Sequence, residues 1–465
     1  MTVKFRQYRF IILSLMLAAL LRVGAIAVYG NFEQPQLYEY GGIARHVLAG
    51  AGYAHVFPIL HPEYGIEPRV YGNATPTAFT LPGYVFVMTA VLGGIGDNIV
   101  GYAFLYLLNL ITALVSLLLL YFLTENLLSI STAKWALLLA AVFPPLVAAT
   151  ATFGGSTWTH MVMLGALLLV VRAMEVRRAE TLALKGRDIT AQGFSPGTMW
   201  KPETPSPSPE RANQIEGFPW PFLLAGMMTG VWTLFRGEAF GAAVLIAVWM
   251  WMRNRSWKKA ALYLAACLVI VLPWSVRNTM VFDRVVPLTT NFWLNAWRGN
   301  NEETTGGGFR SEGGSNWITP ELKEEIEAIP TAQDYEIKVM DLYRARTLDF
   351  ISTHPGRAAI LYLQKAGMFL TLDWSDARAR HPLFMYPQLL LMLFAGIGGV
   401  LLWRQRRFPW PIAIVVIVTM LSVAALHVET RYQLMMGILY IVFAAAALQK
   451  LAQRFFPDNE SSAHA

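Results

Sequence analysis

Charged residues are scarce in this chain of 465 amino acids. Asp, Glu, Lys and Arg together supply 14% of it, whereas a typical soluble domain carries about 25%. Hydrophobic residues supply 55%, and the mean hydropathy is +0.43. This composition excludes an ordinary water-soluble domain, and the repeated apolar runs predict a polytopic membrane protein.

Cysteine and the common cofactor motifs are also lacking. The single cysteine, Cys267, lies in an apolar run, which excludes an intramolecular disulfide. The sequence has no P-loop and no G-x-G-x-x-G in a strand–helix context, so we expect no bound nucleotide. The histidines at positions 46, 55, 61, 160, 354, 381 and 427 show no HExxH, DxD or cysteine-based metal spacing. We predict no metal and no cofactor. One alternative stays open, a structural metal held in one loop by His55, His61, Glu63 and Glu67.

The net charge of +7 could indicate a nucleic-acid partner, but the placement of the basic residues argues otherwise. They cluster at the ends of apolar segments, as in "RNRSWKK" (253–259), "RQRR" (404–407) and the pair Lys450 and Arg454. Cytoplasmic loops of membrane proteins carry this excess of Lys and Arg. We therefore expect membrane lipids as partners and no nucleic acid.

The N-terminus resembles a signal peptide, with Lys4, Arg6 and Arg9 before an apolar run. The run continues past Arg22 to about residue 29 without an A-x-A site, which favours an uncleaved first span. We predict ten spans in an all-α polytopic membrane protein, near 10–29, 99–124, 133–152, 155–174, 218–235, 239–252, 259–275, 383–402, 409–427 and 433–449. The apolar segments 78–96 and 357–372 suit re-entrant or interfacial helices. If both crossed, the protein would have twelve spans, and the segments between them would be inverted.

The spans divide the chain into three parts. Residues 1–275 form a membrane domain with an extracytoplasmic first loop (30–80) and a cytoplasmic, Pro/Ser-rich disordered linker (175–217). Residues 276–356 form an extracytoplasmic cap containing an amphipathic helix over about 332–352. Residues 357–465 form an interfacial helix and the last spans.

Glu39 in the first loop is a candidate general base. It lies between Tyr38 and Tyr40 and precedes apolar residues at helical spacing, namely Ile43, Ala44, Val47 and Leu48. This spacing predicts a helix along the membrane surface that begins near Glu39. A partly desolvated carboxylate can accept a proton from a substrate. A solvated loop carboxylate is the alternative.

Arginines stand at the outer ends of several predicted spans, at Arg236, Arg277 and Arg431, and Arg22 lies in the outer half of the first span. Ionisable groups at membrane depth usually face a polar cavity. Guanidinium groups suit phosphate, and the phosphate expected at a bilayer surface belongs to a lipid. The alternative is structural ion pairing with Glu238 and Glu429, each two residues from an arginine.

Several stretches, in the same order, resemble bacterial GT-C glycosyltransferases, the superfamily of aminoarabinose transferases and protein O-mannosyltransferases. The first are "EYGGIARHVLAGAGY" (39–53) and "NATPTAFTLPGYVFVMTAVLGGIG" (73–96). The later ones are "FRGEAF" (235–240), "PWSVRNTMVFDRVVPLTTNFWLNAWRGNN" (273–301), "HPGRAAILYLQKAGMFL" (354–370) and "ETRYQLMMGILYIVFAA" (429–445). The first loop departs from the family pattern, because Glu39 stands between tyrosines where relatives often carry Asp or an Asp–Glu pair.

This resemblance implies a multi-pass enzyme of the bacterial inner membrane. It would transfer a sugar from a polyprenyl-phosphate donor to a glycan, lipid or protein acceptor on the extracytoplasmic face, with inversion and with Glu39 as base. The residues implied to bind the donor phosphate are Arg236, Arg277, Lys365 and Arg431. Those implied to line the substrate pocket are Tyr40, Glu238, Trp274, Asn278, Glu429 and Tyr432.

Two alternative functions stay open. A lipid-linked glycan ligase or polymerase would share the architecture but move oligosaccharides. A lipid or sugar transporter would place charged residues near the bilayer midplane, whereas the charges here concentrate at one outer leaflet.

Overall fold

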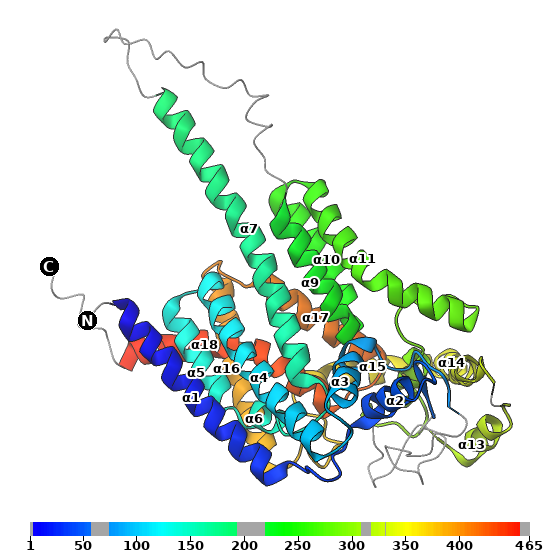
Figure 1. Ribbon diagram of the computed structural model, residues 1–465. Helices are drawn as coiled ribbons and strands as arrows, with labels where there is room; N and C mark the ends of the chain where they lie inside the picture. The colour runs from blue at the N-terminus through cyan, green and yellow to red at the C-terminus, as the bar shows by residue number, and fades with distance from the viewer. Residues whose placement is uncertain (1–2, 57–73, 193–218, 308–317, 331, 456–465) are drawn as a thin grey trace, which may run out of the picture.

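The computed structural model describes residues 3–56, 74–192, 219–307, 318–330 and 332–455. These residues are almost entirely helical (Figure 1). The first half contains α1 (Val3–Tyr29), α2 (Tyr38–Leu48), α3 (Pro82–Gly94), α4 (Ile99–Leu127), α5 (Ile130–Val142), α6 (Pro144–Ala149), α7 (Ser156–Gln192), α9 (Trp220–Phe235) and α10 (Glu238–Asn254). The second half contains α11 (Trp257–Phe282), α12 (Phe292–Gly299), α13 (Pro320–Glu327), α14 (Tyr335–Thr353), α15 (Pro355–Leu370), α16 (Pro382–Arg404), α17 (Trp410–Ala425) and α18 (Thr430–Phe455). A short antiparallel sheet pairs β1 (Ala54–His55) with β2 (Thr75–Pro76).

Six of the helices in the described part of the chain are long and apolar enough to span a membrane. They are Gln7–Tyr29 of α1, α4, Ser156–Glu175 of α7, α11, α16 and α18. Four shorter apolar helices accompany them, α3, α5, α9 and α17. The chain is therefore a polytopic helical membrane protein, as its composition predicts.

Nine of the ten predicted spans correspond to a single helix each. The segment 133–152 does not, because the chain breaks between α5 and α6 at Pro144 and Pro145. The predicted surface helix after Glu39 is α2, and the predicted cap helix is α14.

The predicted linker over 175–217 begins as a helix. α7 continues to Gln192, well beyond the predicted end of its apolar segment. The sequence becomes charged after Glu175 but keeps strong helix formers, so the backbone stays helical where the apolar pattern ends. The Pro/Ser-rich stretch lies outside the described residues.

Glycines allow close packing of the spans. Gly226 and Gly230 are four residues apart on α9 and face α11. A Cβ at Gly226 would lie 2.1 Å from the Tyr263 carbonyl oxygen, and a Cβ at Gly230 would lie 2.7 Å from the Cys267 carbonyl oxygen. Small residues at this spacing let membrane helices approach at backbone contact. The pair α9–α11 is thereby fixed close to the site described below.

Arg22 is buried inside the bundle and caps α5. The carbonyls of Ala140 and Ala141 would normally accept from residues 144 and 145, but both are prolines and have no N–H. The Arg22 guanidinium donates instead to these two oxygens, at 3.1 and 3.0 Å. This arginine, at membrane depth, completes a broken helix.

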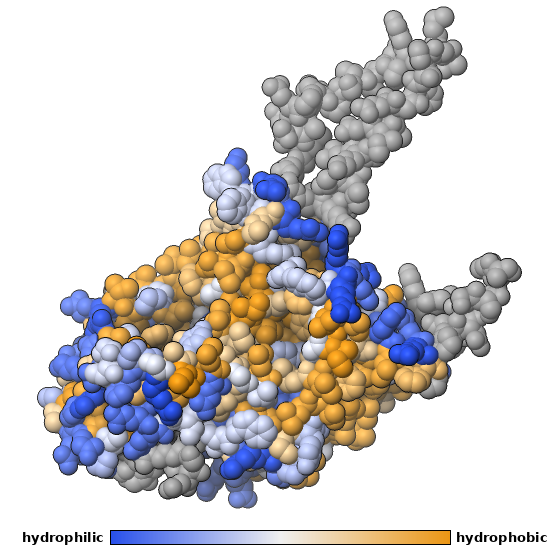
Figure 2. Space-filling view, turned by 180° about the vertical axis from the view of Figure 1, so that it is seen from behind, coloured by the Kyte–Doolittle hydropathy of each residue, from blue (hydrophilic) through white to orange (hydrophobic). Residues whose placement is uncertain are grey.

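The helices α2, α3, α13, α14 and α15 gather at one end of the bundle (Figure 1). Helices α12–α14 share a small core of their own that includes Leu294, Ile326 and Tyr343. In the reversed view of Figure 2, hydrophilic residues gather at the lower left, where these helices lie, while a broad hydrophobic surface covers much of the bundle. The cap is therefore a packed polar layer at the end of an apolar bundle.

Candidate active site

A cavity of about 740 Å³ opens where the cap meets the bundle. Its wall comes from the start of α2, the start of α7, the α9–α10 junction, α12, the end of α17 and the start of α18. Titratable and aromatic side chains in the wall include Glu39, Tyr40, Tyr84, Arg236, Glu238, Arg298, His427, Arg431 and Tyr432. The first-loop carboxylate and two of the four predicted phosphate-binding residues thus share one space.

Glu39 lies in the first turn of α2 and is half-buried. The preceding residue, Tyr38, has φ +54°, a left-handed conformation that costs a bulky residue about 1–3 kcal/mol. Such strain persists where surrounding contacts impose it, and it tends to occur at functional sites. A negative side chain in the first turn is also favoured by the helix dipole.

Arg236 and Glu238 form an ion pair at the α9–α10 junction. α9 ends at Phe235, Arg236 is extended, and Glu238 begins α10, so both side chains project from one tight connection. The Nε atom of Arg236 lies 2.9 Å from Oε1 of Glu238. The ion pair considered from the sequence is therefore present, and it stands in the cavity wall.

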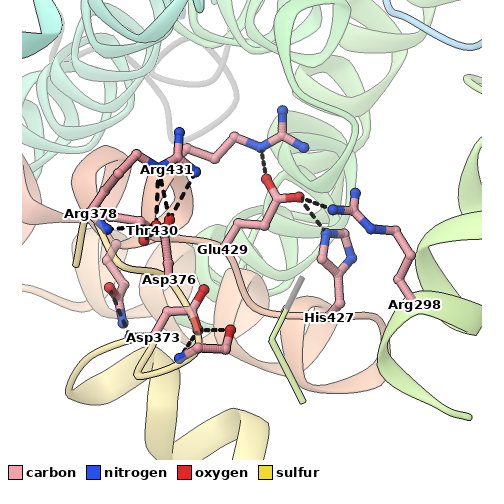
Figure 3. Close-up of polar contacts among 10 residues, drawn as sticks. Arg298, Asp373, Asp376, Arg378, His427, Glu429, Thr430 and Arg431 are labelled. Atoms are coloured by element: carbon pink, nitrogen blue, oxygen red, sulfur yellow. Dashed lines mark hydrogen bonds and ion pairs between the residues drawn. The ribbon is translucent and has the colours of Figure 1, made fainter. Parts of the chain in front are cut away.

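Glu429 holds three partners together (Figure 3). Its Oε1 atom accepts from Nη2 of Arg298 at 2.7 Å and from Nε2 of His427 at 2.9 Å, and its Oε2 pairs with Nε of Arg431. Burial alone would raise the pKa of Glu429, but the charges of Arg431 and Arg298 and the His427 hydrogen bond hold it well below its usual value. Glu429 is therefore ionised and fully engaged.

His427 acts as a neutral donor in this cluster. Burial, with the nearby Arg298 charge, lowers its pKa to about 4, so the ring is uncharged at neutral pH. An ionised carboxylate only accepts hydrogen bonds. The contact with Glu429 therefore requires the tautomer that carries its proton on Nε2.

The ring of Tyr432 contacts two guanidinium groups. The Cζ atoms of Arg236 and Arg431 are 5.0 and 5.5 Å from its centroid, within the range of cation–π attraction. Arg431 pairs with Glu429 through Nε, and its terminal nitrogens point away from that carboxylate (Figure 3). Its side chain is 52% exposed, so these donors are available to a ligand in the cavity.

Arg277 lies outside the cavity wall. Its terminal nitrogens donate to the carbonyls of Thr77, at 2.7 Å, and Tyr53, at 2.9 Å, next to the β1–β2 pair. Trp274 and Asn278 both donate to the Leu288 carbonyl, at 2.7 and 3.2 Å. These three residues, predicted for the donor and substrate sites, hydrogen-bond α11 to the neighbouring loops and are not part of this cavity wall.

Lys365 is likewise engaged by protein oxygens. Its Nζ atom is fully buried and donates to the carbonyls of Gly299 and Leu426, both at 2.9 Å, and to the Asn300 side chain at 3.0 Å. Gly299 lies against this segment so closely that a Cβ would be 1.7 Å from the Leu426 oxygen. Lys365 therefore joins the cap to the α17–α18 connection and does not face the cavity.

Arg298 and His427 are functional candidates that the sequence did not single out. Arg298 lies within the stretch "NAWRGNN", one residue before the closely packed Gly299. An arginine followed by a glycine is common at the ends of surface helices, so the sequence does not distinguish Arg298. The structure does, because α12 packs against the α17–α18 connection and brings Arg298 to Glu429.

Within the described ranges, no group of three or more His, Cys, Asp or Glu side chains could hold a metal ion. His55 is buried beside His46, with ring centroids 6.5 Å apart. The other members of the alternative metal site, His61, Glu63 and Glu67, lie outside those ranges.

No known sequence family matches the chain, and no curated protein matches it by sequence. Solved structures do match its fold. The archaeal oligosaccharyltransferase AglB of Archaeoglobus fulgidus, in complex with an inhibitory peptide and a dolichol-phosphate, aligns over 99% of this chain and 52% of its own, with TM-score 0.53 and 12% identity. An Archaeoglobus fulgidus oligosaccharyltransferase in complex with Zn and sulfate aligns over 95% and 49%, with TM-score 0.50 and 15% identity.

The chain thus spans about half the length of the archaeal enzymes. ArnT from Cupriavidus metallidurans bound to undecaprenyl phosphate aligns over 95% of this chain and 78% of its own, with 12% identity and TM-score 0.38. At such identities, the likeness to the oligosaccharyltransferases is one of fold. The chain has the polytopic helical fold of these oligosaccharyltransferases, which is the fold class that its sequence predicts.

Proposed function

We propose that this protein is an integral membrane glycosyltransferase that moves a sugar from a polyprenyl-phosphate donor to an acceptor hydroxyl with inversion. Glu39 acts as the general base, and Arg236 and Arg431 bind the donor phosphate. The observation that carries this proposal is the presence of an acidic side chain and these guanidinium groups in one cavity. The fold similarity to an oligosaccharyltransferase in complex with a dolichol-phosphate supports a lipid-phosphate donor.

Three carboxylates lie in or beside the cavity wall, Glu39, Glu238 and Glu429, and their partners favour Glu39 as the base. Glu238 is paired with Arg236, and Glu429 is held by three donors. Glu39 has no ion-pair partner among the described residues. A base must have a free oxygen within reach of the proton that it accepts, and of these three side chains Glu39 meets that requirement best.

The arginines fit the leaving group. In an inverting transfer the acceptor oxygen attacks the anomeric carbon while the phosphate oxygen departs with the bonding electrons. Lipid phosphate leaves as a stable anion, so one base suffices where a hydrolase needs an acid and a base. Fixed guanidinium donors stabilise the charge that develops on the departing oxygen.

The cavity wall also has an apolar side suited to a lipid. Leu421, Val423 and Leu426 line it from α17 and the segment that follows, and Phe235 lines it from α9. Leu421 is 45% exposed. A polyprenyl chain could therefore lie along α17 with its phosphate at Arg431.

The charge distribution favours an extracytoplasmic site in the inner membrane. α10 begins at the cavity with Glu238 and ends beside Arg253 and Arg255, and α17 begins after the basic run 404–407 and ends at the cavity. The basic clusters thus stand at the opposite helix ends from the cavity. Because basic loops favour the cytoplasm, the cavity faces outward in this proposal.

Reconstitution with a polyprenyl-phosphate sugar tests the proposal. Glu39→Gln is expected to lower turnover by about a hundredfold to ten-thousandfold while donor binding persists. Glu33→Gln, an exposed carboxylate on the same loop, is the matched control and should keep wild-type turnover. Equal turnover in the Glu39 variant and the wild type would remove Glu39 as the base.

A ligase or polymerase that moves oligosaccharides is a second candidate, favoured by the fold similarity to oligosaccharyltransferases. Donors carrying one sugar and donors carrying an oligosaccharide separate the two functions, because turnover of the oligosaccharide donor alone would favour the ligase. A transporter would move labelled lipid across vesicles without breaking the sugar–phosphate bond.

A further inference from the structure

The connection between α15 and α16 presents an arginine that the proposed function does not use. Arg378 has a side chain 72% exposed, whereas its partner Asp376 is 4% exposed. The Nε and Nη2 atoms of Arg378 bind Oδ1 and Oδ2 of Asp376 at 3.0 and 2.8 Å. One edge of the guanidinium is thus fixed to a buried carboxylate, and the rest of the group faces outward.

Asp376 fastens this arginine next to the cavity. It also accepts from the backbone N–H of Arg378 at 2.8 Å and from Oγ1 of Thr430 at 2.7 Å. Burial would raise the pKa of Asp376, but these hydrogen bonds and the Arg378 charge lower it, so the carboxylate stays ionised. Thr430 is the first residue of α18 and directly precedes Arg431, as Figure 3 shows.

Arg378 also acts on the start of α2. Burial raises the pKa of Tyr38, while the charges of Arg378 and Arg431 lower it and that of Glu39 raises it. The charges of both arginines therefore act on the residue that directly precedes the proposed base. Arg378 is not part of the cavity wall, so it stands beside the space that Arg236 and Arg431 line.

This arrangement holds the Arg378 guanidinium in an orientation in which it can bind an anion. The buried carboxylate of Asp376 holds the long Arg378 side chain in one orientation, while most of that side chain is exposed to solvent. A guanidinium fixed along one edge can still form charge-assisted hydrogen bonds through its remaining nitrogens. Because its orientation is already set, binding loses less side-chain entropy.

We propose that Arg378 binds a second phosphate group at the edge of the cavity, distinct from the donor phosphate at Arg236 and Arg431. The inference rests on the proposed function and extends it to the substrates. The phosphate has two possible sources. It belongs either to a donor linked through a diphosphate or to the acceptor.

The test uses the full chain in lipid nanodiscs and measures the dissociation constants of undecaprenyl phosphate and undecaprenyl diphosphate. A donor source predicts that the wild type prefers the diphosphate and that Arg378→Gln loses this preference by about tenfold to a hundredfold. An acceptor source predicts that Arg378→Gln leaves both lipids unaffected. Inorganic phosphate would then bind the wild type preloaded with undecaprenyl phosphate and would not bind the preloaded variant.

Two variants control the measurement. Arg380→Gln removes an exposed arginine two residues away and should behave as the wild type, whereas Arg378→Lys keeps the charge and should retain part of the effect. Unchanged affinity of Arg378→Gln for undecaprenyl phosphate shows that the fold and donor site are intact. The inference is overturned if the wild type binds undecaprenyl phosphate and the Arg378 variant matches it with all three probes. A wild type that binds neither lipid overturns the proposed function itself.

Discussion

At the scale of single residues, the arginines of this protein divide by what their nitrogens meet. Arg431 pairs with Glu429 through Nε and lines the cavity. Arg277 uses its terminal nitrogens on the carbonyls of Thr77 and Tyr53. The first geometry is suited to a ligand, whereas the second stabilises a loop.

This difference predicts opposite effects of substitution. Arg431→Ala should weaken donor binding by about tenfold to a hundredfold, because a charge-assisted contact to phosphate is lost, with a small change in the thermal unfolding midpoint. Arg277→Ala should lower that midpoint and leave the donor dissociation constant unchanged. Binding of undecaprenyl phosphate and thermal unfolding of both variants measure the contrast. If Arg277→Ala loses as much affinity for undecaprenyl phosphate as Arg431→Ala does, Arg277 is part of the donor site.

Asp373 supplies a pH prediction at the same scale. It is fully buried, its Oδ1 atom accepts from Ser375, and burial raises its pKa from 3.8 to about 6. Above pH 6 both the folded and the unfolded state carry the charge, and the folded state bears the cost of burying it. As the pH falls from 6 to about 4, the folded state takes up the proton first, so this group then adds stability.

Asp373→Asn should therefore raise the free energy of unfolding at pH 7 by about 1–3 kcal/mol. The advantage over the wild type should shrink as the pH falls toward 4. Chemical unfolding at several pH values measures this, with the exposed Asp349→Asn as control. A variant less stable than the wild type at pH 7 would show that the ionised carboxylate is itself required.

At the scale of helices, the sequence predicts most of the fold because lipid imposes a simple rule. A run of about 20 apolar residues must be helical to satisfy its backbone in the bilayer, and α1, α4, α11, α16 and α18 follow from this rule. The rule does not locate helix ends outside the membrane. α7 therefore extends to Gln192 where its apolar pattern has already ended.

Arg22 gives the helix-scale prediction. Arg22→Met should lower the free energy of unfolding by about 2–5 kcal/mol, because two buried carbonyls of α5 would lose their donors. Unfolding in detergent micelles measures the loss. Arg172→Met, at an exposed position on α7, is the control and should change stability little. An equally small loss for Arg22→Met would mean that water or a rearranged helix satisfies these oxygens.

At the scale of the whole molecule, the site is assembled from segments far apart in the chain. The sequence gives the order of these segments but not which of them lie next to each other in the folded protein. Hydropathy and charge predict Arg236, Arg277 and Arg431 at the outer ends of their spans, yet they do not give the direction in which each side chain points. That direction depends on neighbours such as the Thr77 carbonyl, which engages Arg277. Arg298 was missed because α12 reaches Glu429 only through the packing of Gly299 and Lys365.

The orientation of the entire chain in the membrane gives the last prediction. With ten spans, Glu302 in the cap lies outside and Gln405 lies inside. If α3 and α15 also cross, Glu302 is on the cytoplasmic side, as Gln405 is in both arrangements. Gln34 is on the extracytoplasmic side in both arrangements.

All three side chains are exposed, and the only native cysteine, Cys267, is buried. Single cysteines at these positions can therefore be labelled in intact cells with an impermeant maleimide. We expect labelling at positions 34 and 302 and none at 405, because the basic run 404–407 favours the cytoplasm. Labelling at 34 alone would establish twelve spans and put the cap and Arg298 on the opposite side of the membrane from Glu39, which would contradict the shared cavity on which the proposed function depends.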